Sequence, residues 1–398
     1  MAIIKHSLIV AAFLLSGFAA PAIAQDTAPI SNTVGSPGAE LGMDTPGNPT
    51  SIDPLKRTPV PPVKSDRSSE WVVAPIPSYS PSQGWALGLV AQYIFKPAGT
   101  DPASPPSILG AVGFGTEMGS YGGGLGYLGH LDNDRWRVTA AGGYGLVNYD
   151  FFGIGNAAAL QDHPIEVEQQ MSGLLLQLLG RIAPNLYLGP RLYGVNINAS
   201  ARFKNSFVTL PPQETETKTI ALGGKFQWDT RDNTFYPTTG NLANVTIQVF
   251  SEAFGSDFDY RAYEAEYNHY MPMSERDVLA LRGYGRTVDG DVPFFDLSMF
   301  GQHNDLRGYE AGKYRDKLML ATQGEWRHML NDWLGVVAFA GVGEVAPDPA
   351  SLTADDLLWS AGAGLRFRIA RDNPVNFRID LAEGKDGTTF YMSVTEAF

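Results

Sequence analysis

The sequence of 398 residues predicts an all-β fold, a transmembrane antiparallel β-barrel of sixteen strands. Three observations predict it. An export signal precedes the rest of the chain. Segments of about ten residues then alternate apolar and polar side chains, separated by turn residues. The polar side carries charges in mid-strand, whereas the apolar side is aromatic near the strand ends, which is typical of a barrel with a polar interior in a lipid bilayer.

The export signal occupies residues 1–24. It combines Lys5, an apolar stretch from Leu8 to Ala20 and the small-residue triplet Ala22-Ile23-Ala24 before Gln25. This pattern predicts a cleaved signal peptide. A membrane anchor is the alternative, but the apolar stretch is shorter than the roughly 18 residues that a spanning helix needs.

Residues 25–70 form the next region, which is rich in Pro, Gly and Ser and has no apolar periodicity. Such a segment buries too little surface to offset the entropy of ordering, so we expect a disordered periplasmic leader. The barrel is then expected over residues 71–398. A soluble β-sandwich would also alternate along its strands. The charges on the polar faces favour the barrel, and they are Glu264, Glu266, Arg282, Arg286, Arg366, Arg368, Arg378 and Asp380.

The strand count follows from the alternating segments. An even number is typical of single-chain bacterial barrels, and closure is required because an open edge leaves backbone groups unpaired in hydrocarbon. The Gly-rich stretch 110–131 is hard to divide, so the count is fixed only to within two. The sixteen predicted strands begin near Trp71, Trp85, Ile108, Tyr121, Arg135, Glu166, Leu186, Thr217, Leu242, Tyr260, Val278, Leu318, Gly335, Trp359, Val375 and Thr389.

Composition excludes several functions. The chain has 42 acidic and 29 basic residues, a net charge of −13, which argues against a nucleic-acid partner. It has no cysteine, and therefore no disulfide, thiolate metal site or cysteine nucleophile. The histidines lack metal-pair spacing, and there is no Gly-x-Ser-x-Gly elbow. Glu264 and Glu266 are interpreted as a solvated lumenal ladder beside the arginines. We therefore expect no catalytic, cofactor or metal site.

Three motifs follow one another in the second half of the chain. The first is a turn over 229–240 with the turn-forming or charged residues Asp229, Arg231, Asp232, Pro237 and Gly240. The second lies in the longest late loop and consists of Leu306, Arg307, Gly308 and Tyr309. The third is the last strand, with the apolar series Phe390, Met392, Val394 and Phe398.

Together these motifs resemble the barrel of the BamA/TamA superfamily, also called the bacterial surface antigen family. The resemblance is strongest over residues 217–398 and fainter over 71–216, where the segment around Pro190 is similar to an earlier strand. Family members carry periplasmic POTRA domains before the barrel. The 46-residue leader has neither the length nor the pattern of one, so we expect a barrel-only member.

The resemblance implies roles for two of the motifs. In the family, the loop arginine folds back into the lumen and pairs with acids, which implies Arg307 with Glu325 and Asp380 here. An exposed loop arginine is the alternative. Two departures concern the network: Gly341 stands where the family often has an acid, and Gly301-Gln302 replaces a glycine pair. The last strand resembles the family's signal for outer-membrane insertion. An ordinary apolar strand is the alternative.

The resulting functional hypothesis is a barrel of the cell outer membrane that aids insertion or translocation of polypeptides or lipids. A weak seam between residues 71–80 and 389–398 would serve this role. Expected partners are outer-membrane lipids, client proteins and a periplasmic protein that meets the leader. The alternative is a passive pore or structural barrel gated by the Arg307 loop.

Overall fold

The computed structural model describes residues 69–97, 99–101, 104–155, 164–203, 206–208, 216–301, 305–370 and 374–398. The predicted signal peptide and the leader up to residue 68 lie outside this range. The first strand begins at Ser69, so residues 69 and 70 belong to the barrel wall rather than to the leader. None of the helices within the described ranges is long and apolar enough to cross a membrane.

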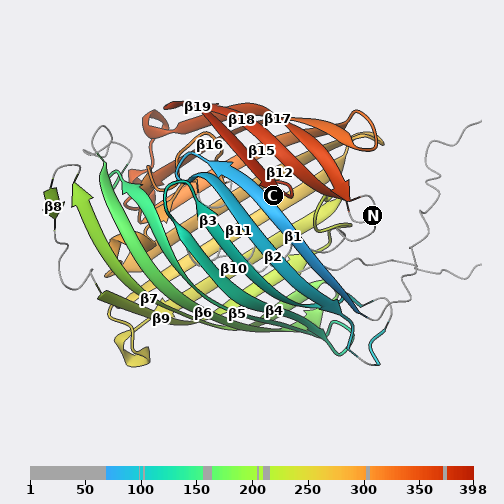
Figure 1. Ribbon diagram of the computed structural model, residues 1–398, viewed down its shortest axis with the longest axis horizontal. Coiled ribbons are helices and arrows are strands. Elements are labelled where there is room, and N and C mark those ends of the chain that lie inside the picture. Colours follow the sequence, from blue (N-terminus) through green and yellow to red (C-terminus); the bar gives the residue numbers. More distant parts are fainter. Residues whose placement is uncertain are drawn as a thin grey trace, which may run out of the picture.

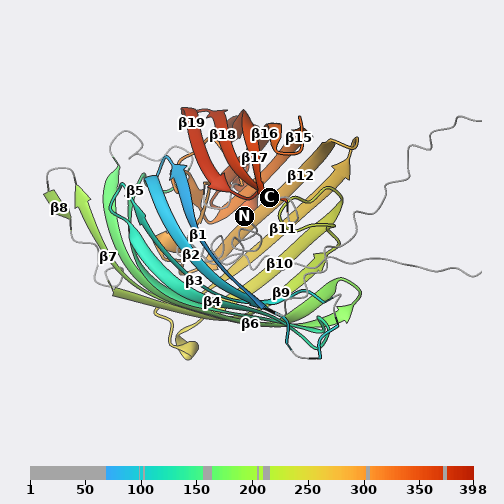
Figure 2. The ribbon, with the colours of Figure 1, turned by 45° about the vertical axis from the view of Figure 1, so that its right-hand side comes forward.

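Sixteen strands form the wall. The first and last strands along the chain, β1 and β19, are neighbours (Figures 1 and 2). They are β1 (Ser69–Ser80), β2 (Gly84–Phe95), β3 (Ser107–Thr116), β4 (Tyr121–Leu131), β5 (Trp136–Phe151), β6 (Ile165–Ala183), β7 (Leu186–Phe203), β9 (Glu216–Asp229), β10 (Gly240–Phe250), β11 (Tyr260–Pro272), β12 (Asp277–Gly290), β15 (Leu318–Met329), β16 (Leu334–Ala346), β17 (Leu358–Ala370), β18 (Val375–Gly384) and β19 (Gly387–Val394).

Short elements lie in the connections. They are β8 (Ser206–Val208), which pairs antiparallel with the end of β7, the two-stranded ribbon of β13 (Ser298–Met299) and β14 (Arg315–Asp316), and the 3-10 helices η1 (Glu252–Phe254), η2 (Phe294–Asp296), η3 (Pro349–Ser351) and η4 (Ala354–Asp356). All wall strands pair antiparallel with their neighbours, which confirms the sixteen-stranded barrel. Each observed strand begins within two residues of its predicted start.

The two faces of the wall differ as predicted. On β11, Tyr263 and Tyr267 are exposed, whereas Glu266 and Asn268 between and beside them are buried. Successive side chains of a strand point to opposite faces, so exposed apolar residues cover the exterior and charged ones line the lumen. Aromatic residues concentrate on the exterior at both barrel ends, as at the two interfaces of a membrane. Examples are Trp71, Trp136, Trp326 and Trp333 at one end and Trp85, Tyr121 and Trp359 at the other.

The two ends of the barrel differ in what they carry. The terminal end is where β1 begins and β19 ends, and the loop end carries the long connection over residues 291–317. The turn between β9 and β10 lies at the terminal end of the barrel. Its Tyr236 is buried, burial raises the pKa of this tyrosine to about 12, and the guanidinium of Arg368 lies 5.1 Å from its ring.

The same turn is held by side-chain hydrogen bonds. Arg231 donates to Asp229 at 2.9 and 2.7 Å, and Asp232 accepts from the backbone N–H of Thr238 at 2.9 Å. Pro237 is within the turn, and Gly240 ends it with a φ of 100°. A side chain at Gly240 would collide with the main-chain oxygen of Thr230, so only glycine fits here.

Gly240→Ala should therefore lower the free energy of unfolding by about 1–3 kcal/mol, from backbone strain and collision. The measurement is urea unfolding of the purified barrel in lipid vesicles. Gly283→Ala is the matched control, because nothing lies within 4 Å of a side chain built there. An equal loss in both variants would contradict the constraint at Gly240.

Candidate functional site: the lumenal arginine network and the seam

The loop over residues 291–317 connects β12 with β15 and enters the lumen. Its base is fixed where Asp296 pairs with Arg286 at 2.7 Å and accepts from the Tyr260 hydroxyl at 2.7 Å. Its tip packs in a buried cluster with the barrel wall. The cluster consists of Tyr284, Phe300, Leu306, Tyr309, Tyr314, Met319, Ala321, Val345 and Leu358. The loop is thus part of the barrel interior.

Arg307 lies in the lumen against the wall and is 1% exposed. Its guanidinium bonds to Glu325 at 2.6 Å and to Asp380 at 2.8 Å, and it also donates twice to the amide oxygen of Gln323. The ring of Phe339 lies 3.5 Å from its central carbon. A buried guanidinium without such partners would be very costly, so the two carboxylates and the amide account for its position.

The two carboxylates are shared with other arginines. Glu325 also accepts from Arg327 at 2.7 Å, and Asp380 also accepts from Arg366 at 2.5 Å. Arg366 extends the chain of contacts to Glu396 at 2.6 Å. The network therefore joins the loop to β15, β17, β18 and the residues that follow β19. The sequence indicated Glu325 and Asp380, whereas Gln323 and Glu396 were missed.

The surroundings of Gly341 explain why a glycine stands where the family often has an acid. A Cβ at this position would lie 2.9 Å from Leu306 and 3.2 Å from the side chain of Gln323. The wall is thus flat where the loop approaches it, and an acid at 341 would displace the loop. Gln323, on the neighbouring strand, supplies the oxygen to Arg307 instead.

Gly308 and Tyr309 dock the loop onto the last strands. Gly308 has a φ of 113°, and its N–H donates to the Tyr391 hydroxyl at 2.9 Å. The Tyr309 hydroxyl donates to the main-chain oxygen of Trp359 at 2.6 Å. Ser360 also donates to the main-chain oxygen of Arg307. The motif therefore contacts β17 and β19, next to the junction between the two ends of the sheet.

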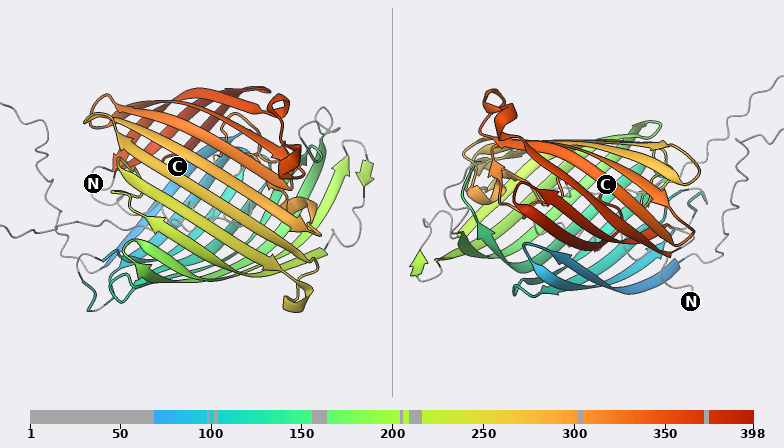
Figure 3. Two further views of the ribbon diagram at one scale, coloured as in Figure 1. Left: turned by 180° about the vertical axis from the view of Figure 1, so that it is seen from behind. Right: turned by 90° about the horizontal axis from the view of Figure 1, so that it is seen from above.

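That junction, the seam, is weakly paired. Within the described residues, the ladder between β1 and β19 contains one residue pair, Tyr79 with Met392. By contrast, β1 and β2 are paired along the whole of both strands. On the exterior, the Tyr79 ring lies 5.3 Å from those of Phe390 and Trp85. Figure 3 (right) shows β1 in blue and β19 in dark red with their ribbons parted.

Two prolines account for this weak pairing. Pro75 and Pro77 have no N–H, yet β1 is fully paired with β2. Proline is tolerated in a strand only where its missing N–H would point away from the paired neighbour. The missing donors therefore belong to the seam edge, and a β1–β19 ladder cannot extend from Tyr79 towards the terminal end.

The end of the chain departs from the predicted apolar series. Strand β19 ends at Val394, and Thr395 has a φ of 73° that turns the chain inward. Phe398 is 5% exposed and packs with Tyr270 and Ala280 in the lumen. It thus does not continue the outward row of Phe390 and Met392, because the turn at Thr395 breaks the alternation.

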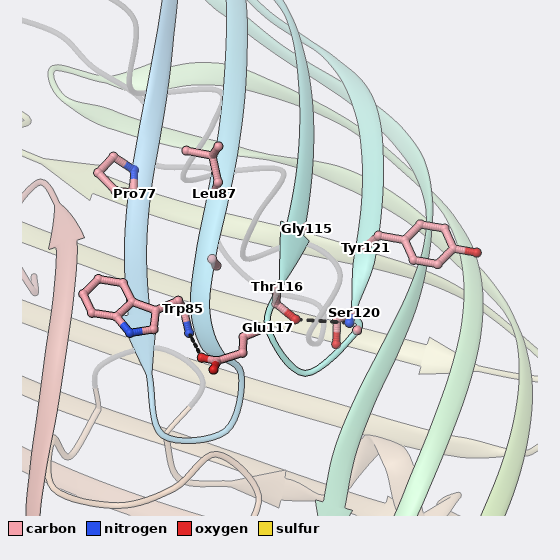
Figure 4. Close-up of a pocket in the computed structure, with 10 residues that line it drawn as sticks. Pro77, Trp85, Leu87, Gly115, Thr116, Glu117, Ser120 and Tyr121 are labelled. Carbon is pink, nitrogen blue, oxygen red and sulfur yellow. Dashed lines mark hydrogen bonds between the residues drawn. The ribbon is translucent and has the colours of Figure 1, made fainter.

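Two other features of the wall are a buried ion pair and a hollow on the exterior. Glu266 pairs with Arg282 at 2.6 Å and is 3% exposed, so this part of the predicted solvated ladder is buried. A hollow of about 780 Å³ lies on the exterior at the loop end of β2–β4 (Figure 4). Glu117 accepts a hydrogen bond from the N–H of Trp85 there, beside exposed apolar residues. In the described ranges, no group of three His, Asp or Glu side chains could hold a metal ion.

The Omp85 superfamily domain matches residues 117–389. The chain belongs to the Omp85 superfamily. This confirms the resemblance that the three motifs indicated. The family and the barrel fold are those of bacterial outer-membrane proteins.

Among solved structures, this Omp85 barrel is similar to BamA from Haemophilus ducreyi lacking POTRA domains 1–3, with 15% identity and a TM-score of 0.55 over 81% of this chain and 70% of that one. It is also similar to CdiB from Escherichia coli, with 11% identity and a TM-score of 0.56 over 83% of this chain and 63% of that one. CdiB from Acinetobacter baumannii is similar as well, with 11% identity and a TM-score of 0.54 over 82% of this chain and 60% of that one. The chain thus spans less than two thirds of either CdiB chain, and these likenesses concern the fold.

Arg307→Ala should lower the free energy of unfolding by about 3–5 kcal/mol, because it leaves Glu325 and Asp380 short of a buried partner. Urea unfolding in vesicles measures this loss. The control is Arg135→Ala, whose side chain is 63% exposed and lies 3.7 Å from Asp132, with an expected change within about 0.5 kcal/mol. If the two variants unfolded alike, the network would not hold the loop.

Proposed function

We propose that this Omp85 barrel aids the insertion or translocation of polypeptides, or of lipids, at the outer membrane. The observation that carries the proposal is the seam, at which one residue pair joins β1 to β19. A transmembrane sheet is stable only when its backbone groups are paired, so an incompletely paired edge favours the arrival of another strand.

The docked loop supports the same role. Arg307, Gly308 and Tyr309 contact β17 and β19, so the loop holds the strands on one side of the seam. The edge of β19 contains no proline, whereas β1 lacks donors at Pro75 and Pro77. A client strand would therefore find the more complete set of backbone partners on β19. The apolar residues Phe390 and Met392 are proposed to serve as well in the chain's own insertion.

The proposal predicts that depletion of the protein lowers the amounts of other folded outer-membrane barrels. The wild-type chain should restore them, because its seam can open. Tyr79→Cys/Met392→Cys should restore them only under reducing conditions, since paired residues of antiparallel strands lie about 4.5–5.5 Å apart and can form a disulfide. Each single-cysteine variant is a control, and the chain has no other cysteine. Unchanged barrel levels on depletion would contradict the proposal.

The second candidate is a pore closed by a plug, which the position of the loop in the lumen favours. Met299 and Arg315 are register partners, so residues 300–314 can be replaced by Asn-Gly without altering the flanking ribbon. A plug predicts a higher single-channel conductance in planar bilayers for this variant. Replacing residues 348–356 between β16 and β17 is the control. Unchanged conductance after removal of the lumenal loop would count against a pore.

A further inference from the structure

The turn between β9 and β10 reaches across the terminal mouth, which is the opening of the lumen at the terminal end. The ring of Tyr236 lies 5.1 Å from the guanidinium of Arg368 on β17 and 5.8 Å from that of Arg327 on β15. Along the wall, β17 is the fifth strand from β10. Because the wall curves into a closed barrel, a residue of this turn contacts β17 only if the turn leaves its own part of the wall and lies over the opening.

The neighbouring Phe235 contacts another part of the wall. It packs against a buried apolar cluster formed by the inward face of β1–β4 and by residues of β18 and β19. Of these strands β4 is the nearest to the turn, and it is the fourth strand from β9 along the wall. Phe235 and Tyr236 thus contact strands on different sides of the opening, so the tip of the turn crosses it. The buried members of the cluster are Val72, Ile76, Val90, Ile94, Ile108, Val112, Leu128, Val375 and Val394.

The turn is held together by its own hydrogen bonds. The amide oxygen of Asn233 accepts from the N–H groups of the two aromatic residues at 2.8 and 3.0 Å. Asp232 accepts from the N–H of Thr238 at 2.9 Å. At the base of the turn, the N–H of Thr230 donates to the main-chain oxygen of Asn241 at 2.8 Å. A tip that moves about this base pair keeps the bonds within it, so it moves as one body.

The tip is attached to the other strands by its two rings. In the described ranges, the hydrogen bonds of residues 232–238 stay within the turn. The lumenal loop at the other end is attached differently, by the ion pairs of Arg307 with Glu325 and Asp380 and by hydrogen bonds to β17 and β19. Breaking ring contacts costs less than breaking buried ion pairs. The terminal mouth is therefore the end that opens more easily.

Buried donors without partners lie on the lumenal wall further from the terminal mouth. Gln177 Nε2, Arg191 Nε and Gln248 Nε2 have no hydrogen-bond partner in the part of the chain that the structure describes. They follow one another in register across β6, β7 and β10, with Gly223 of β9 between the last two. An unpaired buried donor is destabilising, so these groups favour a lumen that water or the oxygen of a solute reaches.

We propose that the turn over residues 229–240 is a lid on the terminal mouth, which opens about its base and admits water and small hydrophilic solutes to the lumen. The inference goes beyond the proposed function, because it requires neither an open seam nor a client strand. In the closed position, Tyr236 contacts Arg327 and Arg368, and Phe235 contacts the apolar cluster. In the open position both rings leave these contacts, while Arg327 keeps its ion pair with Glu325.

The position of the lid is measured by electron paramagnetic resonance between two nitroxide labels, in the full chain in phosphatidylethanolamine–phosphatidylglycerol vesicles. Thr234→Cys carries one label at the tip, and Asp332→Cys carries the other on the exposed turn between β15 and β16. The chain has no other cysteine. Tyr236→Ala should raise the share of a second, open distance at least threefold. Thr239→Ala, on the exposed side of the same turn, should leave the distances unchanged.

Arg368→Gln is a second variant, which removes one contact of the Tyr236 ring and leaves the turn itself intact. It should shift the distances in the same direction as Tyr236→Ala. The same single distance in both variants and in the wild-type chain would overturn the proposal, because the turn would then be a fixed part of the wall.

A lumenal cysteine measures whether the moving turn controls access. Glu264 alternates with the exposed Tyr263 on β11 and is half-buried on the inward face, so Glu264→Cys reports on the lumen. A membrane-impermeant thiol reagent should label it at least tenfold faster when Tyr236→Ala is added, and at the unchanged rate when Thr239→Ala is added. Val245→Cys, on the exterior, should react alike with every form of the turn. Equal labelling of Glu264→Cys in all forms would overturn the role of the turn as a lid.

Discussion

The ion pairs of Arg307 are the interaction on which the lumen depends. The guanidinium of this loop residue is buried inside the barrel, and the carboxylates of Glu325 and Asp380, with the amide oxygen of Gln323, make that position favourable. The same carboxylates hold Arg327 and Arg366, so the loop is one member of a shared set. Because removal of one member leaves several charges short of a partner, the loop and the inner walls of β15, β17 and β18 respond together.

The seam depends on a constraint of the opposite kind. The lumenal network adds contacts, whereas Pro75 and Pro77 remove them, since an imide nitrogen cannot donate. On one side of the seam the loop fixes β17–β19, and on the other side β1 is joined to β19 by the register pair of Tyr79 with Met392. The two sides of the seam are thus held by contacts of different kinds.

The sequence was sufficient for the barrel because the alternation of side chains is a local property. Strand starts and inward charges follow from a period of two and from turn residues, whereas the expectation that Arg307 pairs with Glu325 and Asp380 came from the resemblance of the loop motif to the family. The pairing of Arg366 with Glu396 depends on the bend at Thr395, which the alternating pattern does not indicate. For the same reason, the inward position of Phe398 was missed.

The apolar inward face of β1–β4 was missed for another reason. Alternation can be recognised only when the two faces differ, and here Val90 and Leu89 are equally apolar although one is buried and the other exposed. Glycine-rich strands such as β4 weaken the pattern further. Gly341 could not be interpreted from the sequence either, because a glycine does not indicate which residue fills the space of its missing side chain. In the structure that residue is Leu306.

The prolines of β1 have one more consequence, which concerns neighbouring molecules. Outer membranes are crowded with barrels, and an incompletely paired edge in such a layer invites fusion of two copies into one larger sheet. Two molecules that meet seam to seam cannot join their β1 strands along residues 75–77, because neither strand has donors there. The residues that leave the seam weakly paired therefore also bar a continuous β1–β1 ladder between two copies.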